Sequence, residues 1–354
     1  MNLGDLIRQK MENLEAEKHQ NDIPKDGKLI VQLRSDELVN TTLKVISKRL
    51  QETREGKPFL LLTFNDLSGT LRGVDWNHAK KNDERIPVGS VVRVNGKMSL
   101  FDGRPQLTLG PSHDDLQLLS EGEYDSSRFI PITDKNYTTM YQQLIEAIGA
   151  VEDPFLGTLL RKIFEEDPQM ASSFAESPAA ISIHHAYKGG LLEHSLSVLE
   201  LSLAIARTYS EPIQIDLLRA GALLHDIGKM KEYSIRSYGF ETSSEGELLG
   251  HIMIGSAIVE EKARLLPMRS DQTLTQLQHI ILSHHGEMEW GSPVLPKTYE
   301  ALIIHMADHL DAKYAIFRES LQKMTESSMN HEDGWSGYNK VLGRRVFLRG
   351  GKEG

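Results

Sequence analysis

The sequence contains no cysteine, which excludes disulfides, thiolate zinc sites and a cysteine nucleophile and fits a reducing cytoplasm. It has neither a Walker P-loop nor a Gly-x-Ser-x-Gly nucleophile elbow. No apolar run approaches the roughly 18 residues that span a bilayer, and the charged N-terminus does not resemble a signal peptide. We therefore expect a cytoplasmic protein with no membrane partner.

Negative charges outnumber positive charges in the chain as a whole, but one part of it carries an excess of positive charge. The 354 residues include 40 Lys and Arg and 50 Asp and Glu, which gives a net charge of −10. Residues 28–112 hold 14 Lys and Arg against 9 Asp and Glu, so this segment carries +5 and the remainder carries −15. The distribution favours a basic, polyanion-binding module joined to an acidic one.

Residues 28–113 predict a small β-barrel. Five short strand-like segments lie between residues 38 and 111, separated by turn pairs such as Glu55-Gly56, Ser68-Gly69 and Asp102-Gly103. Five strands in so short a span suit a closed barrel, with a helical turn between the third and fourth strands. Residues 58–76 and 89–109 resemble an OB-fold of the nucleic-acid-binding type. In the third strand, Gly73 and Asp75 stand at positions where a more regular barrel-strand sequence is expected.

An OB-fold binds single strands through aromatic stacking platforms and a basic groove. Strand alternation puts Phe59 and Phe64 on opposite faces, so at most one of them faces the groove. For each aromatic residue the alternative is a place in the barrel core. The predicted nucleic-acid contacts are Lys57, Phe64, Arg72, Trp76, Phe101 and Arg104, with Phe59 and Lys97 as further candidates.

The rest of the chain predicts mainly helices. Residues 137–325 have apolar side chains at i, i+3, i+4 and i+7, as in a packed all-α domain, except for a hairpin or loop at 231–248. Residues 1–27 predict a helix that docks or makes an oligomer contact, followed by a linker. Residues 114–136 predict a second linker, and the tail at 326–354 is expected to be partly disordered. The predicted fold class is multi-domain α and β, with an N-terminal OB-fold barrel followed by an all-α domain. The apolar stripe of the first helix is Leu3, Leu6, Ile7, Met11 and Leu14.

The segment ALLHDIGK, residues 222–229, puts two ionisable residues at the end of an apolar helix that Gly228 is expected to terminate. Histidine and aspartate are suitable ligands for Mn, Fe, Zn or Mg. Because a carboxylate has two oxygens, Asp226 is able to bridge two cations, as in two-metal phosphoryl-transfer sites, with His225 on one of them.

Five further candidate ligands lie beside apolar residues on other predicted helices, so each should point inward or line a cleft. Taken singly, each histidine is explained as an ordinary core or surface residue whose hydrogen-bonding groups have partners. Burying several such groups without partners costs much free energy, and a shared divalent-metal centre removes that cost. The five residues are His194, His251, His284, His285 and Asp308.

The order His…His-Asp…His…His-His…Asp over residues 180–320 resembles the HD-domain superfamily of metal-dependent phosphohydrolases. The resemblance implies that Lys229 faces the scissile phosphate and stabilises developing charge, so Asp226 and Lys229 are the predicted catalytic residues. His184 and His185 are weaker candidates for substrate-phosphate contacts, with loop capping as the alternative. The resemblance further implies one ion held by His194, His225, Asp226 and Asp308, and another held by Asp226, His251, His284 and His285.

A barrel followed by such a domain, with the segments IHHAYKGGLLEHSLSV and LLGHIMIG, resembles the YhaM-type 3′→5′ exoribonucleases over about residues 36–320. The resemblance implies removal of nucleoside monophosphates from the 3′ end of single-stranded RNA or DNA. It favours Mn²⁺, with Fe, Co, Mg or Zn as other candidate metals. Two other functions stay open: an HD-domain hydrolase of nucleotides or cyclic nucleotides with a regulatory barrel, and a non-catalytic nucleic-acid-binding protein. The lack of Gly-Tyr-Pro after His285 disfavours the cyclic-dinucleotide class, and the intact ligand set disfavours the non-catalytic protein.

Overall fold

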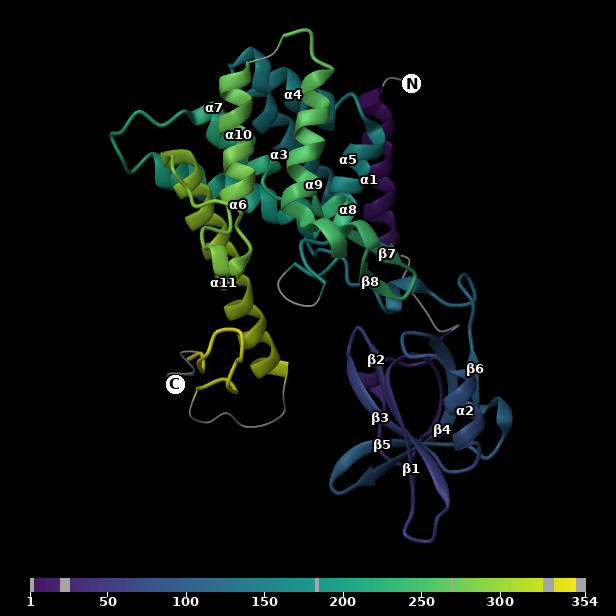
Figure 1. The fold of residues 1–354 in the computed structure, drawn as a ribbon. Helices are drawn as coiled ribbons and strands as arrows, with labels where there is room; N and C mark the ends of the chain where they lie inside the picture. The colour runs from purple at the N-terminus through teal and green to yellow at the C-terminus, as the bar shows by residue number, and fades with distance from the viewer. Residues whose placement is uncertain (1–2, 20–25, 182–184, 269, 327–333, 348–354) are drawn as a thin grey trace, which may run out of the picture. The chain divides into compact units, whose positions relative to one another are not determined.

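The computed structural model describes residues 3–19, 26–181, 185–268, 270–326 and 334–347. The chain divides into two compact units, whose elements Figure 1 labels. The barrel unit comprises residues 17–131 and 235–240, and the helical unit comprises residues 1–16, 132–234 and 241–354. Within the described ranges, none of the helices has the length and apolar character that a bilayer crossing requires.

The barrel unit is built around a closed five-stranded sheet, as predicted. Its strands follow the order β1-β2-β3-β5-β4, and an additional pairing between β1 and β4 closes it. The first half of β1 pairs with β4 and the second half with β2, with a register shift between Val45 and Ser47. This long, bulged strand therefore joins the two edges of the sheet. The strands are β1 (Leu38–Glu52), β2 (Pro58–Asp66), β3 (Gly69–Asp75), β4 (Val91–Phe101) and β5 (Arg104–Leu109).

The two irregular residues of β3 have structural roles. Phe64 is fully buried in the barrel core, and a Cβ at Gly73 would lie 2.4 Å from its ring, so glycine makes room for the phenyl group. The Asp75 carboxylate accepts hydrogen bonds from the backbone N–H of Asn77 (2.9 Å) and from the side chain of Asn82 (2.6 Å). It thereby ties β3 to α2 (Ala79–Arg85), the predicted helical turn.

The predicted linker at 114–136 is mostly part of the barrel unit. It contains β6 (Leu116–Leu118), which pairs with β4, and the 3₁₀ turn η3 (Ser126–Arg128). Arg128 donates to the carbonyl oxygens of Gly27 and Thr42, each at 2.8 Å. Because these contacts join residues that are far apart in the sequence, local composition does not show them. Two further 3₁₀ turns of this unit are η1 (Ile30–Gln32) and η2 (His113–Asp115).

The helical unit confirms the predicted all-α domain, and local sequence explains where several helices begin. Asn136, Asp153, Asp167, Ser243 and Ser270 each accept a hydrogen bond from the backbone N–H three residues later, as N-caps do. The helices are α1 (Leu3–His19), α3 (Tyr137–Gly149), α4 (Pro154–Phe164), α5 (Pro168–Glu176), α6 (Gly190–Ala206), α7 (Ile215–Leu224), α8 (Lys229–Glu232), α9 (Ser244–Arg264), α10 (Asp271–Ser283) and α11 (Tyr299–Glu326), with the 3₁₀ turn η4 (Met288–Trp290). The predicted hairpin is β7 (Tyr233–Arg236) and β8 (Gly239–Thr242).

Both ends of the chain contribute to the helical unit. Met11 and Leu14 of α1 are buried in its main core, so this helix docks within the chain, which was one of its two predicted roles. Leu342 and Val346 pack on Ile316 of α11 in a small second core. The described part of the predicted tail, residues 334–347, therefore packs on α11, and partial disorder of the tail stays a prediction. The rest of the tail lies outside the described residues.

Candidate metal centre

Six of the seven predicted metal ligands lie near helix ends or directly after a kink in the helical unit. His194 is in the first turns of α6, and Asp308 is in the middle of α11. The remaining ligands follow interruptions of helices: His225 and Asp226 come directly after α7, His251 follows the Gly250 kink in α9, and His284 and His285 come directly after α10. The end of α7, the kink in α9 and the end of α10 thus contribute five of these side chains, and α6 and α11 contribute one each.

Glycines allow two of these segments to approach each other closely. A Cβ at Gly228 would lie 1.9 Å from the carbonyl oxygen of His251. Gly228 has an ordinary helical φ of −63°, so the prediction that it acts as a helix stop is wrong and its role is close approach. Gly250 has a φ of 69°, which glycine adopts readily, and this interrupts α9 just before His251.

Asp226 lies between two groups of ligands, with one oxygen toward each. Its Oδ2 is 3.4 Å from Nε2 of both His194 and His225. Its Oδ1 is 3.5 Å from Nε2 of His251 and 3.4 Å from Nε2 of His284. This is the geometry expected of a carboxylate that bridges two cations.

The two outer ligands complete these groups. Asp308 Oδ1 lies 3.2 Å from His194 Nε2. His285 offers a ligand atom that lies with those of His251 and His284 within 4.8 Å of one another. The structure therefore brings all seven predicted ligands together in the two groups that the resemblance implied.

Each of the five histidines points its Nδ1 at an oxygen that accepts a hydrogen bond. Carbonyl and carboxylate oxygens only accept, so Nδ1 is the protonated nitrogen in the neutral ring and Nε2 carries the lone pair toward the centre. The acceptors lie 2.8–3.1 Å away and are Asp311 for His194, the Ala222 carbonyl for His225, Glu232 for His251, the Ile281 carbonyl for His284 and the Trp290 carbonyl for His285.

The inward-facing atoms need a cation. Nε2 of His194 and Nε2 of His225 face each other at 3.2 Å, and in neutral rings both would present lone pairs. Among the described residues, the buried side-chain atoms without a hydrogen-bond partner include Asp226 Oδ1, His251 Nε2 and His284 Nε2. Leaving such atoms unsatisfied costs free energy that a bound divalent cation would offset. The residues present therefore fit a divalent-metal site.

The electrostatics agree with this chemistry at Asp226, His284 and His285. Burial alone would raise the pKa of Asp226, but Lys229 and His225 hold it well below its usual range. Burial lowers the pKa of His284 and that of His285. Ionised carboxylate and neutral imidazole are the forms that bind a cation. His194 differs: burial acts to lower its pKa, but Asp226, Asp308 and Asp311 raise it well above the ordinary value.

Lys229, the second predicted catalytic residue, also lies at the centre. Its Nζ donates to Asp226 Oδ2 at 2.6 Å, and its side chain is mostly buried. The ammonium group is therefore held at the edge of the ligand cluster by the same carboxylate that links its two halves.

Two residues that orient ligands were missed by sequence reasoning. Asp311 lies one helical turn after Asp308 and accepts hydrogen bonds from His194 Nδ1 (2.8 Å) and the Ser197 hydroxyl. Glu232 accepts from His251 Nδ1 and is largely buried. Both read as ordinary surface charges in the sequence, although the three-residue spacing from Asp308 was a usable signal for Asp311.

His185 is not positioned for the predicted contact with a substrate phosphate. It is buried, its Nδ1 lies 2.7 Å from the Tyr187 hydroxyl, and its Nε2 lies 3.0 Å from Asp311 Oδ2. Both ring nitrogens already have partners, so His185 supports Asp311. His184, the other weak candidate, lies outside the described residues.

The predicted nucleic-acid contacts of the barrel unit fall into separate groups. Trp76 is 39% exposed and stacks on Phe59, with ring centroids 4.7 Å apart. Arg72 lies on the same pair of strands, opposite Thr63. Phe101 and Arg104 face each other near the tip of the β4–β5 hairpin, and Phe101 is 65% exposed.

The prediction that Phe64 contacts nucleic acid is wrong. It is fully buried in the barrel core, so it cannot stack on a base, and Phe59 is the aromatic residue on the outward face of β2. Lys57 is exposed just before β2, and Lys97, also exposed, lies 3.7 Å from Asp36.

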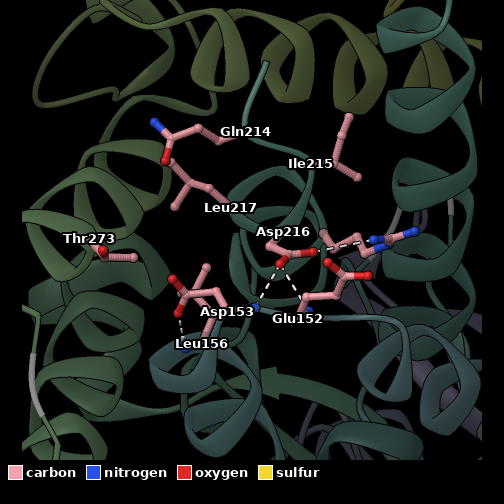
Figure 2. Close-up of a pocket in the computed structure, with 9 residues that line it drawn as sticks. Glu152, Asp153, Leu156, Gln214, Ile215, Asp216, Leu217 and Thr273 are labelled. Atoms are coloured by element: carbon pink, nitrogen blue, oxygen red, sulfur yellow. Dashed lines mark hydrogen bonds and ion pairs between the residues drawn. The ribbon is translucent and has the colours of Figure 1, made fainter. Parts of the chain in front are cut away.

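A pocket of about 410 Å³ in the helical unit contains none of the predicted ligands (Figure 2). Asp216 accepts hydrogen bonds from the backbone N–H of Glu152 (2.9 Å) and Asp153 (2.8 Å) and pairs with Arg219 (3.3 Å). Its carboxylate is therefore satisfied and links the start of α4 to α7. The pocket is lined by Glu152, Asp153, Leu156, Gln214, Ile215, Asp216, Leu217, Arg219 and Thr273.

Comparisons with known proteins match both units. The HD domain family matches residues 191–313, and an OB-fold nucleic acid binding domain family matches residues 42–111. The 3′-5′ exoribonuclease YhaM of Geobacillus sp. (strain WCH70) is 33% identical over 299 residues, which cover 84% of this chain and 89% of that protein.

Two further relatives carry the same name. The Bacillus subtilis (strain 168) protein is 33% identical over 289 residues, 81% of this chain and 89% of the relative. The Halalkalibacterium halodurans protein is 32% identical over 269 residues, 76% of this chain and 81% of the relative.

Proposed function

The chain belongs to the YhaM family of 3′-5′ exoribonucleases, and on that premise we propose that it is a cytoplasmic, divalent-metal-dependent enzyme that removes nucleoside monophosphates from the 3′ end of single-stranded RNA. The observation that carries the proposal is the convergence of Nε2 lone pairs and carboxylate oxygens around Asp226. Such a donor set serves a metal-assisted attack of water on a phosphodiester.

We assign one cation to His194, His225, Asp226 and Asp308 and a second to Asp226, His251, His284 and His285. Mn²⁺ is the proposed ion, because imidazole and carboxylate ligands suit it and the resemblance favours it. When bound, the ions polarise the phosphate oxygens and lower the pKa of a water molecule.

The protein's own groups orient this chemistry. Asp311 and Glu232 hold His194 and His251 in the required tautomer and direction. Lys229, held by Asp226, supplies a positive charge near the position of the phosphate and stabilises the charge that develops there. The sequence contains no cysteine to act as a nucleophile, and direct attack by water requires none.

The barrel unit supplies the affinity for single strands in this proposal. Trp76, on its Phe59 support, and Phe101 are exposed aromatic surfaces, and Lys57, Arg72 and Arg104 are exposed cations for phosphates. Single-stranded DNA offers the same phosphates and base faces, and we propose it as a second substrate.

The test uses one single-stranded RNA carrying a label at either its 5′ or its 3′ end, with Mn²⁺ or with a chelator. We expect a 5′-labelled ladder that shortens stepwise and a 3′ label released at once as a mononucleotide, both only with metal. Parallel incubations use DNA of the same sequence and free nucleotides. Turnover of free nucleotides without shortening of RNA would contradict the proposal and support a nucleotide hydrolase.

A further inference from the structure

An exposed tryptophan lies in the loop that follows the His284-His285 pair. Trp290 belongs to η4 and is 52% exposed. Its indole stacks on His309 with 5.1 Å between ring centroids and only 6° between ring planes. Because one face of the indole is occupied by His309 while about half of the residue is exposed, it presents a flat apolar surface to solvent.

Each member of the stacked pair, Trp290 and His309, is connected to a residue of the candidate metal centre. The Trp290 carbonyl accepts the hydrogen bond of His285 Nδ1 at 2.8 Å, so the backbone of Trp290 positions a ligand. His309 follows Asp308, another ligand, and consecutive Cα atoms lie about 3.8 Å apart. Trp290 is therefore connected to a candidate ligand of each group, to His285 through its backbone carbonyl and to Asp308 through the stacked ring of the next residue, His309.

The loop that carries Trp290 is held firmly. Ser292 donates through its backbone N–H to the Glu287 carbonyl (3.2 Å) and through its hydroxyl to the Leu282 carbonyl (3.1 Å). Gly286 has a φ of 79°, and a Cβ there would lie 2.0 Å from the His305 ring. This close approach seats the loop on α11, so the position of the indole is set before any ligand arrives.

We propose that Trp290, supported by His309, is the stacking platform for the base of the 3′-terminal nucleotide. The inference rests on the proposed exoribonuclease function and names where that substrate's terminal base lies. A phosphate held at the metal centre carries its nucleoside beside it, and the exposed indole is the adjacent flat surface. Stacking accepts every base because every base has a π-face, which an enzyme that shortens RNA stepwise requires.

A protein partner is the competing occupant of this surface. The exposed face of α11 carries Leu302, Met306 and Leu310, which are about half exposed. These side chains lack the parallel ring stack and the hydrogen-bonded link to a ligand that Trp290 has. The geometry therefore favours the nucleobase at Trp290, and an interface between copies of the chain becomes an outcome of the test.

The experiment measures removal of the last nucleotide from two single-stranded RNAs that differ only in whether the 3′-terminal ribose carries a base. With Mn²⁺ present, wild type, Trp290→Ala and Trp290→Phe are compared, with Trp335→Ala as the matched control. Trp335 is 40% exposed, lies in the helical unit and packs against Phe347 with 4.9 Å between ring centroids. Mn²⁺ affinity and molecular mass in solution are measured for each variant.

We expect Trp290→Ala to lower kcat/KM about 10- to 100-fold on the base-bearing RNA and less than about threefold on the abasic RNA. Trp290→Phe should restore most of the rate, Trp335→Ala should match wild type, and Mn²⁺ affinity should be unchanged. Wild type should itself prefer the base-bearing end about tenfold or more, which tests the platform even if Trp290→Ala does not fold.

Equal losses on both RNAs would show that Trp290 acts only by holding His285, and the platform would be rejected. No loss would reject it as well. A changed mass in solution with unchanged discrimination would assign the surface to an interface between copies. If wild type shortens neither RNA, the proposed function itself fails, and this result is distinct from every outcome that concerns Trp290 alone.

Discussion

The helical unit and the barrel unit hold their functional side chains in opposite ways. In the helical unit the candidate ligands are mostly buried, and every histidine has a second partner that sets its direction. In the barrel unit most of the candidate contacts are exposed, and Trp76 stacks on Phe59. Burial makes misplacement costly and so preorganises the centre, whereas exposed groups bind any strand with little orientation.

The largest effect is expected from Asp226→Ala, which removes the carboxylate that faces both ligand groups. Turnover of RNA should fall by about 10⁴-fold or more, while binding of RNA by the barrel unit survives. Turnover of RNA is measured in assays stopped at fixed times, and binding of RNA is measured by fluorescence anisotropy. Asp216→Ala is the matched control: it should cost about 1–3 kcal/mol of stability, because the α4 and α7 contacts are lost, and leave kcat intact. Retained activity in Asp226→Ala would remove its bridging role.

The next largest effect is expected from chelation of the metal, which should destabilise the helical unit and leave the stability of the barrel unit unchanged. Removing the metal leaves buried carboxylates and lone pairs uncompensated in the helical unit only. If the ion is normally present at about 100 times its Kd, its loss costs about 2.7 kcal/mol of stability. Calorimetry should show a lowered transition for the helical unit and an unchanged one for the barrel unit. A chelator shift of the same size in Asp226→Ala would contradict the site.

A smaller effect is expected from Asp311→Asn. Asparagine keeps the size of the side chain but loses the charge that holds His194 Nδ1 and the Ser197 hydroxyl. Mn²⁺ affinity, measured by titration calorimetry, should weaken about 10- to 100-fold. Asp216→Asn serves as the control with an unchanged affinity. An unaltered affinity in Asp311→Asn would show that His194 is oriented by packing alone.

The smallest effect on function is expected in the barrel unit. Trp76→Ala should weaken binding of single-stranded RNA by about 1–3 kcal/mol, since it removes one stacking surface, and should leave kcat on very short RNAs unchanged. Phe64→Ala is the contrast, because this core residue should cost about 3–5 kcal/mol of barrel stability. Equal effects of the two variants on stability would contradict the assignment of their faces.

The cluster of candidate metal ligands was predictable because the positions of these residues are chemically unusual. A histidine or aspartate beside Leu and Ile on an apolar helix face needs a reason for burial, and seven such residues in one order share one reason. Periodicity likewise predicted the helical domain, strand-like segments between turn pairs predicted the barrel strands, and the segment that contains β7 and β8 was predicted as a hairpin or loop. The segment at 114–136 was misread because the contacts of Arg128 are with residues about 86–101 positions away.

Alternation along β2 established that Phe59 and Phe64 face opposite sides, but only closure of the barrel decided which side is the interior. Asp311 and Glu232 look like solvent-exposed charges until α6 and α9 are packed against them. Residue type and spacing therefore determined which groups form the centre, because few chemistries tolerate them buried together. Tertiary structure alone decided the histidine tautomers, the position of Asp226 between the two groups and the placement of Trp290, because each depends on atoms from separate helices or turns meeting within a few ångströms.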